Sequence, residues 1–464
     1  MSNFAYYIVC AALTLIVLTG IYLMSKVKTA LFGNLLGAGA LMLAVAITII
    51  RNPGNLSIVL ICLLAASIFG LIWSSKVKMI EMPETVALLN GIGGLASAII
   101  GGIEFLTCTG EAFSLATAML AVVIGTITFT GSLIAAGKLS KKIDSAPRSF
   151  KGHLTVSIIL VSLMILSIVF PTIGKFSYTA LFIGIVASAI FGTLFAFAVG
   201  GADMPITISL LNSLSGVAGS IAGMAVYNIL LVAIGGIVGA SGLLLTQIMC
   251  RSMNRSLADI LLGKTTVSNS ESSVPEHVTK IENSEKFDKN NSTEVLMTIR
   301  DAKNIIIVPG YGMALSQAQF LIKELYDVLT SSKVTVRFAI HPVAGRMPGH
   351  MNVLLCEADI DYEDLYELDD INEDFEKCDL AIVIGANDVI NPAARDATDT
   401  PIYGMPILNV DLAKNIIICN YDLKPGYAGV ENPIYSRPSG VSILLGDAKE
   451  SITKLIDILK NPES

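Results

Sequence analysis

The chain has 464 residues, of which 53% are hydrophobic and 15% charged, and its mean hydropathy is +0.69. So apolar a composition excludes an ordinary soluble globule, because much of the chain must lie in lipid. The formal net charge of −7 argues against nucleic-acid binding, which requires a basic stripe. Apolar residues dominate up to about Cys250 and polar residues return from Ser268 onward, so we expect a membrane part followed by a soluble part.

Nine apolar stretches have the length of about 20 residues that a helix needs to cross the hydrocarbon core. They run over Phe4–Met24, Ala30–Ile50, Asn55–Trp73, Glu84–Ile103, Phe113–Ala136, Leu154–Phe170, Phe176–Val199, Met204–Gly223 and Asn228–Cys250. The first is no cleavable signal peptide, since it lacks a basic leading region and eight more spans follow it. We therefore predict nine transmembrane helices.

Basic residues in the short loops predict the orientation, because such loops stay on the cytoplasmic side. One set of alternate loops holds Lys26, Lys28, Lys76, Lys78, Lys138, Lys141, Lys142, Arg148, Lys151, Arg251 and Arg255. The other set holds only Arg51 and Lys175. The amino terminus is thus expected outside and the carboxy-terminal domain in the cytoplasm.

Polar side chains in the apolar stretches are candidates for a proton path, because an unpaired polar group in hydrocarbon is costly. Asn90, Asp203 and Asn212 are the three that we single out. Asp203 also precedes Met204 and Pro205, so capping of a helix is an alternative role for it. Glu104 and Glu111 fall at the outer side, where solvation explains them as well as a proton entrance does.

Seven cysteines lie far apart, without a CxxC pair or a nearby histidine, and predict no metal site. We interpret them as small buried apolar side chains. They are Cys10, Cys62, Cys108, Cys250, Cys356, Cys378 and Cys419.

The soluble part begins with a polar linker and continues as an α/β domain. Residues 1–262 are assigned to the membrane domain, 263–293 to a flexible linker and 294–464 to the nucleotide-binding domain. Strands are expected at Asn304–Val308, Val334–Ile340, Leu380–Ile384, Ile407–Val410, Asn415–Cys419 and Val441–Leu445, with helices at Ala314–Thr330 and His350–Glu357. Alternation of apolar strands with helices predicts a Rossmann-like, doubly wound parallel sheet.

A glycine turn follows the first expected strand and leads into a helix. Gly310 and Gly312 permit a tight turn and close approach of backbone N–H groups to a pyrophosphate. A GxG pair alone is weak evidence, but its place between strand and helix favours dinucleotide binding. The third glycine of the usual pattern is replaced by Leu315.

Three further loops at strand ends carry candidate binding groups. Gly345 and Arg346 follow the second strand, where no acid stands to accept a ribose hydroxyl, and this favours NADP over NAD. Residues 385–388, Gly-Ala-Asn-Asp, follow the strand at Leu380–Ile384, where turn formation is the alternative role. Tyr427 lies in a glycine-bracketed segment that resembles a lid.

Several long motifs resemble one family, the beta subunits of proton-translocating nicotinamide nucleotide transhydrogenase. In the soluble part they are residues 307–314, 341–355, 383–388, 426–430 and 446–449, and in the membrane part 81–84, 126–138, 200–205, 211–213 and 249–256. The resemblance covers nearly the whole chain except the linker.

The resemblance implies an enzyme that exchanges hydride between NAD(H) and NADP(H) while protons cross the membrane. This chain would bind NADP(H), an alpha subunit would bind NAD(H), and two alpha-beta units would form a dimer in the bacterial inner membrane. An ion transporter with a nucleotide-sensing domain, or an inactive structural subunit, are the alternatives. A matching pair of interrupted helices would favour a transporter, and the spans show no such pair.

The resemblance also implies site residues. Asp388 and Arg346 are expected to be catalytic, with Asn90, Asp203 and Asn212 on the proton path. The nucleotide would contact Gly310, Tyr311, Gly312, Met313, Ala314, Gly345, Arg346, Gly385, Ala386, Asn387, Asp388, Lys424, Gly426, Tyr427, Ala428, Gly446 and Asp447. Because the family binds its nucleotide in reversed orientation, Arg346 is expected near the nicotinamide and diphosphate rather than the 2′-phosphate.

Two departures from the family pattern affect these expectations. Many members carry Lys-Arg-Ser for the 2′-phosphate where this chain has Asn420, Tyr421 and Asp422, so we expect a weakened preference for NADP(H). Some members carry a membrane histidine where Asn90 stands, and asparagine does not titrate near neutral pH. Asn90 and Asn212 are therefore expected to line a hydrated path that Asp203 gates.

Overall fold

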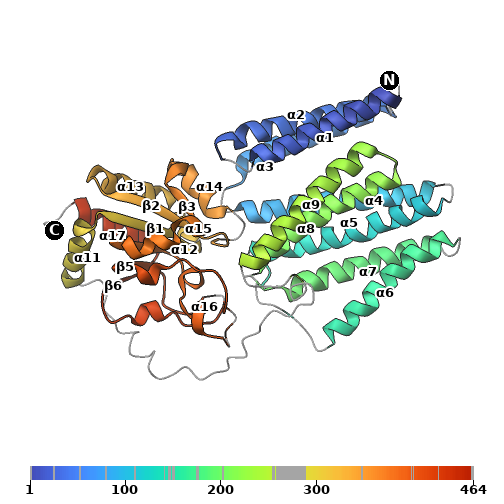
Figure 1. Cartoon of the computed structure of the whole chain (residues 1–464). Helices are drawn as coiled ribbons and strands as arrows, with labels where there is room; N and C mark the ends of the chain where they lie inside the picture. Colours follow the sequence, from blue (N-terminus) through green and yellow to red (C-terminus); the bar gives the residue numbers. More distant parts are fainter. Residues whose placement is uncertain are drawn as a thin grey trace. The chain divides into compact units, whose positions relative to one another are not determined.

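The chain folds into two units, one mainly of membrane helices and one an α/β unit (Figure 1). The computed structural model describes residues 3–24, 27–51, 54–78, 81–108, 111–140, 142–144, 148, 152–173, 177–200, 203–252, 257, 289–345, 349–398, 400, 402–426 and 428–460. The first unit comprises residues 1–200 and 207–246, and the second comprises 201–206 and 247–464.

Within the described residues, nine helices are long and apolar enough to cross a membrane, which confirms the prediction. They are α1 (Asn3–Met24), α2 (Val27–Arg51), α3 (Leu56–Lys76), α4 (Met82–Thr107), α5 (Ala112–Leu139), α6 (His153–Thr172), α7 (Ser177–Ala198), α8 (Met204–Ala225) and α9 (Ile229–Ser252). Helix α5 extends past its expected end, so Lys138 lies in its last turn and not in a loop. His153 is the first residue of α6.

Glycines bring several of these helices into direct backbone contact. A Cβ added to Gly125 of α5 would lie 2.4 Å from the carbonyl oxygen of Gly94 on α4. One added to Gly216 of α8 would lie 2.6 Å from the nitrogen of Gly239 on α9. Such small residues allow close helix packing, and side-chain hydroxyls then reach across: Ser213 donates to the carbonyl of Gly239 at 2.6 Å.

The α/β unit contains six parallel strands in the order β3-β2-β1-β4-β5-β6, which confirms the predicted fold class. The strands are β1 (Asn304–Pro309), β2 (Thr335–Ile340), β3 (Leu365–Glu367), β4 (Leu380–Ile384), β5 (Asn415–Asn420) and β6 (Val441–Leu445). The helices are α11 (Lys289–Asp301), α12 (Tyr311–Ser316), α13 (Gln319–Ser331), α14 (His350–Glu357), α15 (Leu368–Ile371), α16 (Ala393–Asp396) and α17 (Ala448–Lys460). Short 3-10 turns cover Tyr362–Asp364, Asn372–Lys377, Asp388–Ile390, Val410–Leu412 and Pro433–Ser436.

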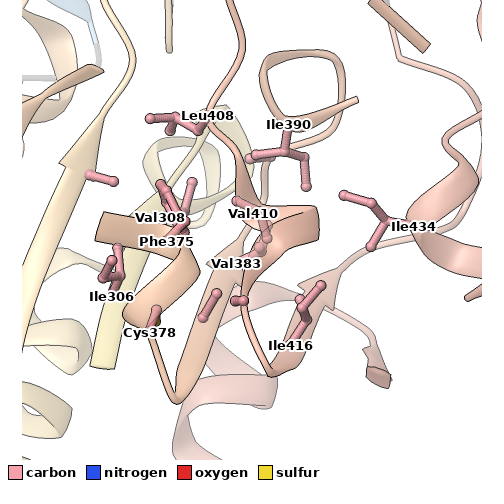
Figure 2. Close-up of a cluster of buried hydrophobic side chains, with 14 of the residues drawn as sticks. Ile306, Val308, Phe375, Cys378, Val383, Ile390, Leu408, Val410, Ile416 and Ile434 are labelled. Carbon is pink, nitrogen blue, oxygen red and sulfur yellow. The ribbon is translucent and has the colours of Figure 1, made fainter. Parts of the chain in front are cut away.

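Alternate side chains of the central strands form an apolar core on one face of the sheet. Ile306 and Val308 of β1, Val383 of β4 and Ile416 of β5 point into this cluster, and Phe375 covers it (Figure 2). Residues of the opposite parity, such as Ile305 and Ile307, are also fully buried, because helices cover the second face.

Four local expectations are wrong. Ile407–Val410 is not a strand: Leu408 and Val410 are buried in the core, and the Leu408 N–H donates to the Val389 carbonyl outside any ladder. A short buried apolar segment has the same pattern as a short strand. The expected helix Ala314–Thr330 is two helices, α12 and α13, separated at Gln317, which has a φ of +52°.

The third error is that we did not predict strand β3. Its three residues are flanked by acids and give no apolar run. The fourth concerns the cysteines, because Cys62 and Cys356 are exposed. Helix α11 also begins at Lys289, within the segment assigned to the linker, whose residues 263–288 lie outside the described part.

Candidate functional site

The strand order places the glycine turn after β1 beside the turn after β4. Strands β1 and β4 pair in parallel, and the chain turns in opposite directions from them, so a topological switch point lies at their carboxyl ends. Ligands of doubly wound sheets bind at this position. The predicted glycines Gly310, Gly312 and Gly385 meet there.

The three glycines pack backbone against backbone. A Cβ on Gly310 would lie 2.3 Å from the Gly385 carbonyl oxygen, and one on Gly385 would lie 2.4 Å from the Gly312 Cα. The Gly310 N–H donates to the Ile384 carbonyl at 2.8 Å, and the Gly312 N–H to the Gly385 carbonyl at 2.9 Å. These glycines therefore join two turns of the chain. The N–H groups of Gly310 and Gly312 are bonded within the protein, and binding of a pyrophosphate at this turn stays a prediction.

Neighbouring predicted residues share this environment. Met313 and Ala314 are buried at the start of the broken helix, and Ala386 is buried behind the second turn. Tyr311 opens α12. The residues that we predicted to contact the nucleotide in these two turns thus lie together at one edge of the sheet. Several of them are buried.

Asn387 and Asp388 connect the turn after β4 to the segment that follows β5. Asn387 Nδ2 donates to the Lys424 carbonyl at 2.9 Å, and Asp388 Oδ2 accepts from the Ala428 N–H at 3.1 Å. The Asp388 carboxylate also packs against Gly426, since a Cβ there would lie 2.4 Å from Oδ1. We name residues 424–426 and 428–432 the covering segment. The two side chains hold it over the turn.

Two further asparagines extend this network and were not on our predicted list. Asn391, fully buried, donates to the Glu431 carbonyl at 3.1 Å, and Asn432 Nδ2 donates to Asn387 Oδ1 at 3.2 Å. Asn391 follows the Gly-Ala-Asn-Asp turn by three residues, and Asn432 follows the glycine-bracketed segment that contains Tyr427. The signal that they bind another loop was absent, because asparagine next to proline is explained by a turn alone.

His341 fixes the loop after β2. It is 2% exposed; its Nε2 lies 2.8 Å from the Pro406 carbonyl, and its Nδ1 accepts from the Val343 N–H at 3.2 Å. Burial lowers the pKa of His341 to about 4, with the Pro406 bond acting in the opposite direction. The ring is thus neutral, with its proton on Nε2.

The rest of this loop is only partly described. Gly345 has a φ of +100°, and a Cβ there would lie 2.5 Å from His350 Nδ1, so only glycine fits. Arg346 and Tyr427, both predicted site residues, lie outside the described residues.

The end of β5 differs from a phosphate-binding arrangement. Asn420 points inward, and its Nδ2 donates to the Ala386 carbonyl at 2.9 Å and to Tyr435 Oη at 3.0 Å. Tyr421 is 79% exposed, and Asp422 accepts from the Lys424 N–H at 3.2 Å. Lys424 is exposed beside them. Asn420 thus has a structural role, and Lys424 is the cation of this stretch.

The turn after β6 also has a structural explanation. Gly446 donates its N–H to the Asn420 carbonyl at 3.0 Å and has a φ of +146°. Asp447 Oδ1 accepts from the Lys449 N–H at 2.9 Å, just before α17 begins. An acid at this place caps the helix and complements its dipole.

In the membrane unit, residues next to Asn90 on α4 pack against polar residues of α5 and α8. Asn90 is 7% exposed and its Nδ2 has no partner among the described residues; the same holds for the hydroxyl of fully buried Ser132 on α5. A Cβ on Gly91 would lie 3.1 Å from Ser132 Cβ, and one on Gly93 would lie 2.6 Å from Ser215 Oγ of α8. Helices α4, α5 and α8 thus meet at this level.

Asn212 precedes Ser215 by three residues on α8, as Asn90 precedes Gly93 on α4. Three spans separate α4 from α8, so the two helices run in the same direction and bring both asparagines to a similar depth. Asn212 is partly exposed, whereas Asp203, before α8, is only 3% exposed. Ser132 was not predicted, because the sequence does not show which of the hydroxyls in the spans lacks a partner.

Comparison with known proteins covers almost the whole chain. Residues 5–458 match the family model described as NAD(P) transhydrogenase beta subunit. The chain is 37% identical over 466 residues to NAD(P) transhydrogenase subunit beta of Rhodospirillum rubrum, and the alignment covers 98% of each chain. A second sequence from that organism, with the same name, has the same identity and coverage.

Proposed function

Because this chain belongs to the family of NAD(P) transhydrogenase beta subunits, we propose that it binds NADP(H) and exchanges hydride with NAD(H), coupled to proton movement. The name beta subunit implies an alpha subunit as partner, and we assign NAD(H) to that subunit. Family membership favours the enzyme over the ion transporter that we considered.

The observation that carries the proposal is the glycine junction at the switch point of the sheet. Gly310 and Gly312 approach Gly385 so closely that no side chain fits between the two turns. The carboxyl edge of the sheet therefore carries no side chain at this junction, and a bound dinucleotide requires such room for close approach. NADP(H) would supply the hydride, and the chain would place and shield it.

The covering segment would close the site. Asn387, Asp388 and Asn391 hold this segment through its backbone, so it stays over the turn after β4. Exclusion of water favours hydride transfer, because water would otherwise solvate the developing charge. We assign Asp388 and Arg346 to the catalytic region, and Tyr427 to the closing segment.

The grip on the 2′-phosphate is the weakest part of the fit. Asn420 is committed to Ala386 and Tyr435, while Asp422 places a negative charge beside Lys424. A phosphate of charge about −2 gains most from paired cations. We therefore propose that this chain binds NADP(H) with reduced selectivity.

The proton path would pass the polar contact between α4, α5 and α8. Asn90 and Ser132 bury polar atoms that lack protein partners in the described part, and such atoms favour ordered water. Neither side chain titrates near neutral pH, so water would carry the proton between them. Asp203, buried before α8, is the titratable residue that we assign to proton exchange.

We place the protein in the bacterial inner membrane, as a dimer of alpha-beta units with the α/β unit in the cytoplasm. Support for the orientation comes from the basic residues, which gather in alternate loops. The described spans make it a multi-pass membrane protein.

The test uses inside-out vesicles that contain both subunits. Addition of NADPH and an NAD analogue should give hydride transfer, seen by absorbance, and simultaneous proton movement, seen with a pH-sensitive dye. Asp203→Asn should abolish proton movement, whereas Asp144→Asn, at an exposed loop acid, should not. Absence of hydride transfer by the native pair would refute the proposed function, and normal pumping by Asp203→Asn would remove Asp203 from the path.

A further inference from the structure

Lys138 is the largest fully buried side chain among the described residues, with 1% of its surface exposed. It belongs to the last turn of α5, inside the membrane unit. A buried ammonium in a transmembrane helix is costly unless specific groups compensate it. The partners of Lys138 therefore indicate what it does.

Two of these partners are backbone carbonyls at the end of α7. Lys138 Nζ donates to the Phe197 carbonyl at 2.9 Å and to the Val199 carbonyl at 2.7 Å. The ammonium also lies 5.7 Å from the centre of the Phe197 ring. The same Phe197 carbonyl accepts from the Arg148 N–H at 3.0 Å. The end of α7 is thus bonded from α5 and from the α5–α6 connection.

These bonds satisfy carbonyl groups that are buried away from water. The last carbonyls of a helix have no partner within it, and they carry the negative end of the helix dipole. Ala198, Val199 and Gly200 are all buried, so the carbonyls of this stretch depend on protein donors. A cation at this end satisfies the carbonyls and complements the dipole together.

The bonded stretch leads into α8. Met204, its first residue, comes five positions after Val199, and α8 then carries Ser209, Asn212 and Ser213. The position of the end of α7 therefore sets where the connection to α8 starts.

We infer that Lys138 is a positioning residue for the proton-coupled step: its ammonium holds the end of α7 and so fixes the start of the connection to α8. The inference rests on the proposed function, because it concerns the coupling of proton movement to hydride transfer. We assign the hydride chemistry to the α/β domain, which lies in the other unit of the chain. Loss of Lys138 should therefore uncouple the two processes and leave hydride transfer itself working.

The experiment compares Lys138→Met, Lys138→Arg and Lys76→Met in vesicles with the alpha subunit. Methionine keeps the length and removes the donors, whereas arginine keeps both charge and donors. Lys76 is the matched control, since it also lies in the last turn of a spanning helix but is exposed. The readouts are hydride transfer by absorbance and protons moved per hydride.

We expect Lys138→Met to lower the protons moved per hydride by about tenfold, within the range that a lost coupling contact produces, with hydride transfer retained. Lys138→Arg should restore the ratio, and Lys76→Met should leave it unchanged. An unchanged ratio in Lys138→Met, or an equal loss of both readouts in a membrane-inserted protein, overturns the inference.

Should Lys138→Met fail to insert, Lys138→Gln takes its place, because it also removes the charge, and Lys138→Arg remains the rescue. A lowered ratio in Lys138→Gln that Lys138→Arg restores supports the inference, because a guanidinium can donate to both carbonyls. An unchanged ratio in Lys138→Gln overturns it. Native vesicles that transfer hydride without moving protons would refute the proposed function instead, so the two failures are distinguishable.

Discussion

Replacing Gly385 with alanine tests whether the glycine junction holds the nucleotide site together. Gly385 has a φ of +66°, and its new Cβ would lie 2.4 Å from Gly312 Cα and 2.6 Å from Met313 N. These atoms are backbone, so no flexible side chain can move aside. The turns after β1 and β4 must separate.

The loss of unfolding free energy in Gly385→Ala has two parts, which a control variant separates. A left-handed backbone costs an alanine about 1 kcal/mol. Separation of the turns breaks the bond from the Gly312 N–H to the Gly385 carbonyl and strains a packed region, for about 2 to 3 kcal/mol more. Gly349 has a similar φ of +71° but nothing within 4 Å of its Cβ. Gly349→Ala should therefore lose only the first part.

Pulse proteolysis of the full chain in detergent, over a urea series, measures the unfolding of the α/β unit. Gly385→Ala should unfold at clearly lower urea than Gly349→Ala, and it should also bind NADP(H) more weakly. Equal midpoints for the two variants would show that the backbone contact does not stabilise the unit. Normal nucleotide affinity in Gly385→Ala would separate the junction from the binding site.

Three further predictions concern the same unit. Because burial holds the pKa of His341 near 4 while an unfolded histidine titrates near 6.5, the folded state should lose about 3 kcal/mol of stability as the pH falls from 6.5 to 4; His341→Gln should flatten that part of a urea-midpoint profile. The native chain should prefer NADP over NAD by less than about a thousandfold, ~4 kcal/mol, and Tyr421→Arg with Asp422→Ser should tighten NADP binding by about tenfold; titration of both nucleotides checks this. Asn391→Ala should release the covering segment and speed NADP dissociation about tenfold or more, and an unchanged dissociation rate would contradict its role.

The fold class was predictable because both parts of the chain repeat a clear pattern. Long apolar stretches define the spans, and apolar strands separated by helices define the parallel sheet. Local departures came from residues with no sequence signal. Gln317 breaks a helix without glycine or proline, and Leu408 lies in an apolar segment that enters the core without pairing in the sheet.

The edge of the sheet at which the candidate residues meet was predictable, but the bonds of individual residues were less so. The turns after β1 and β4 do meet, as strand ends in a parallel sheet must. The partners of Asn391, Asn420 and Lys138 lie 40, 34 and 59 residues away, respectively, in the sequence. We assigned Lys138 to a loop because we expected its helix to end earlier. Side-chain bonds between distant segments leave no periodic pattern.

In both units, the sequence does not reveal the role of each glycine. A sequence cannot separate a glycine that leaves room for a ligand from one that leaves room for another part of the chain, because both positions exclude a Cβ. The atoms that an added Cβ would meet make the distinction. For Gly385, Gly125 and Gly216 those atoms are backbone atoms of a second element. The glycines of this chain thus first bring its own backbones together, and the nucleotide site that we propose lies beside one such contact.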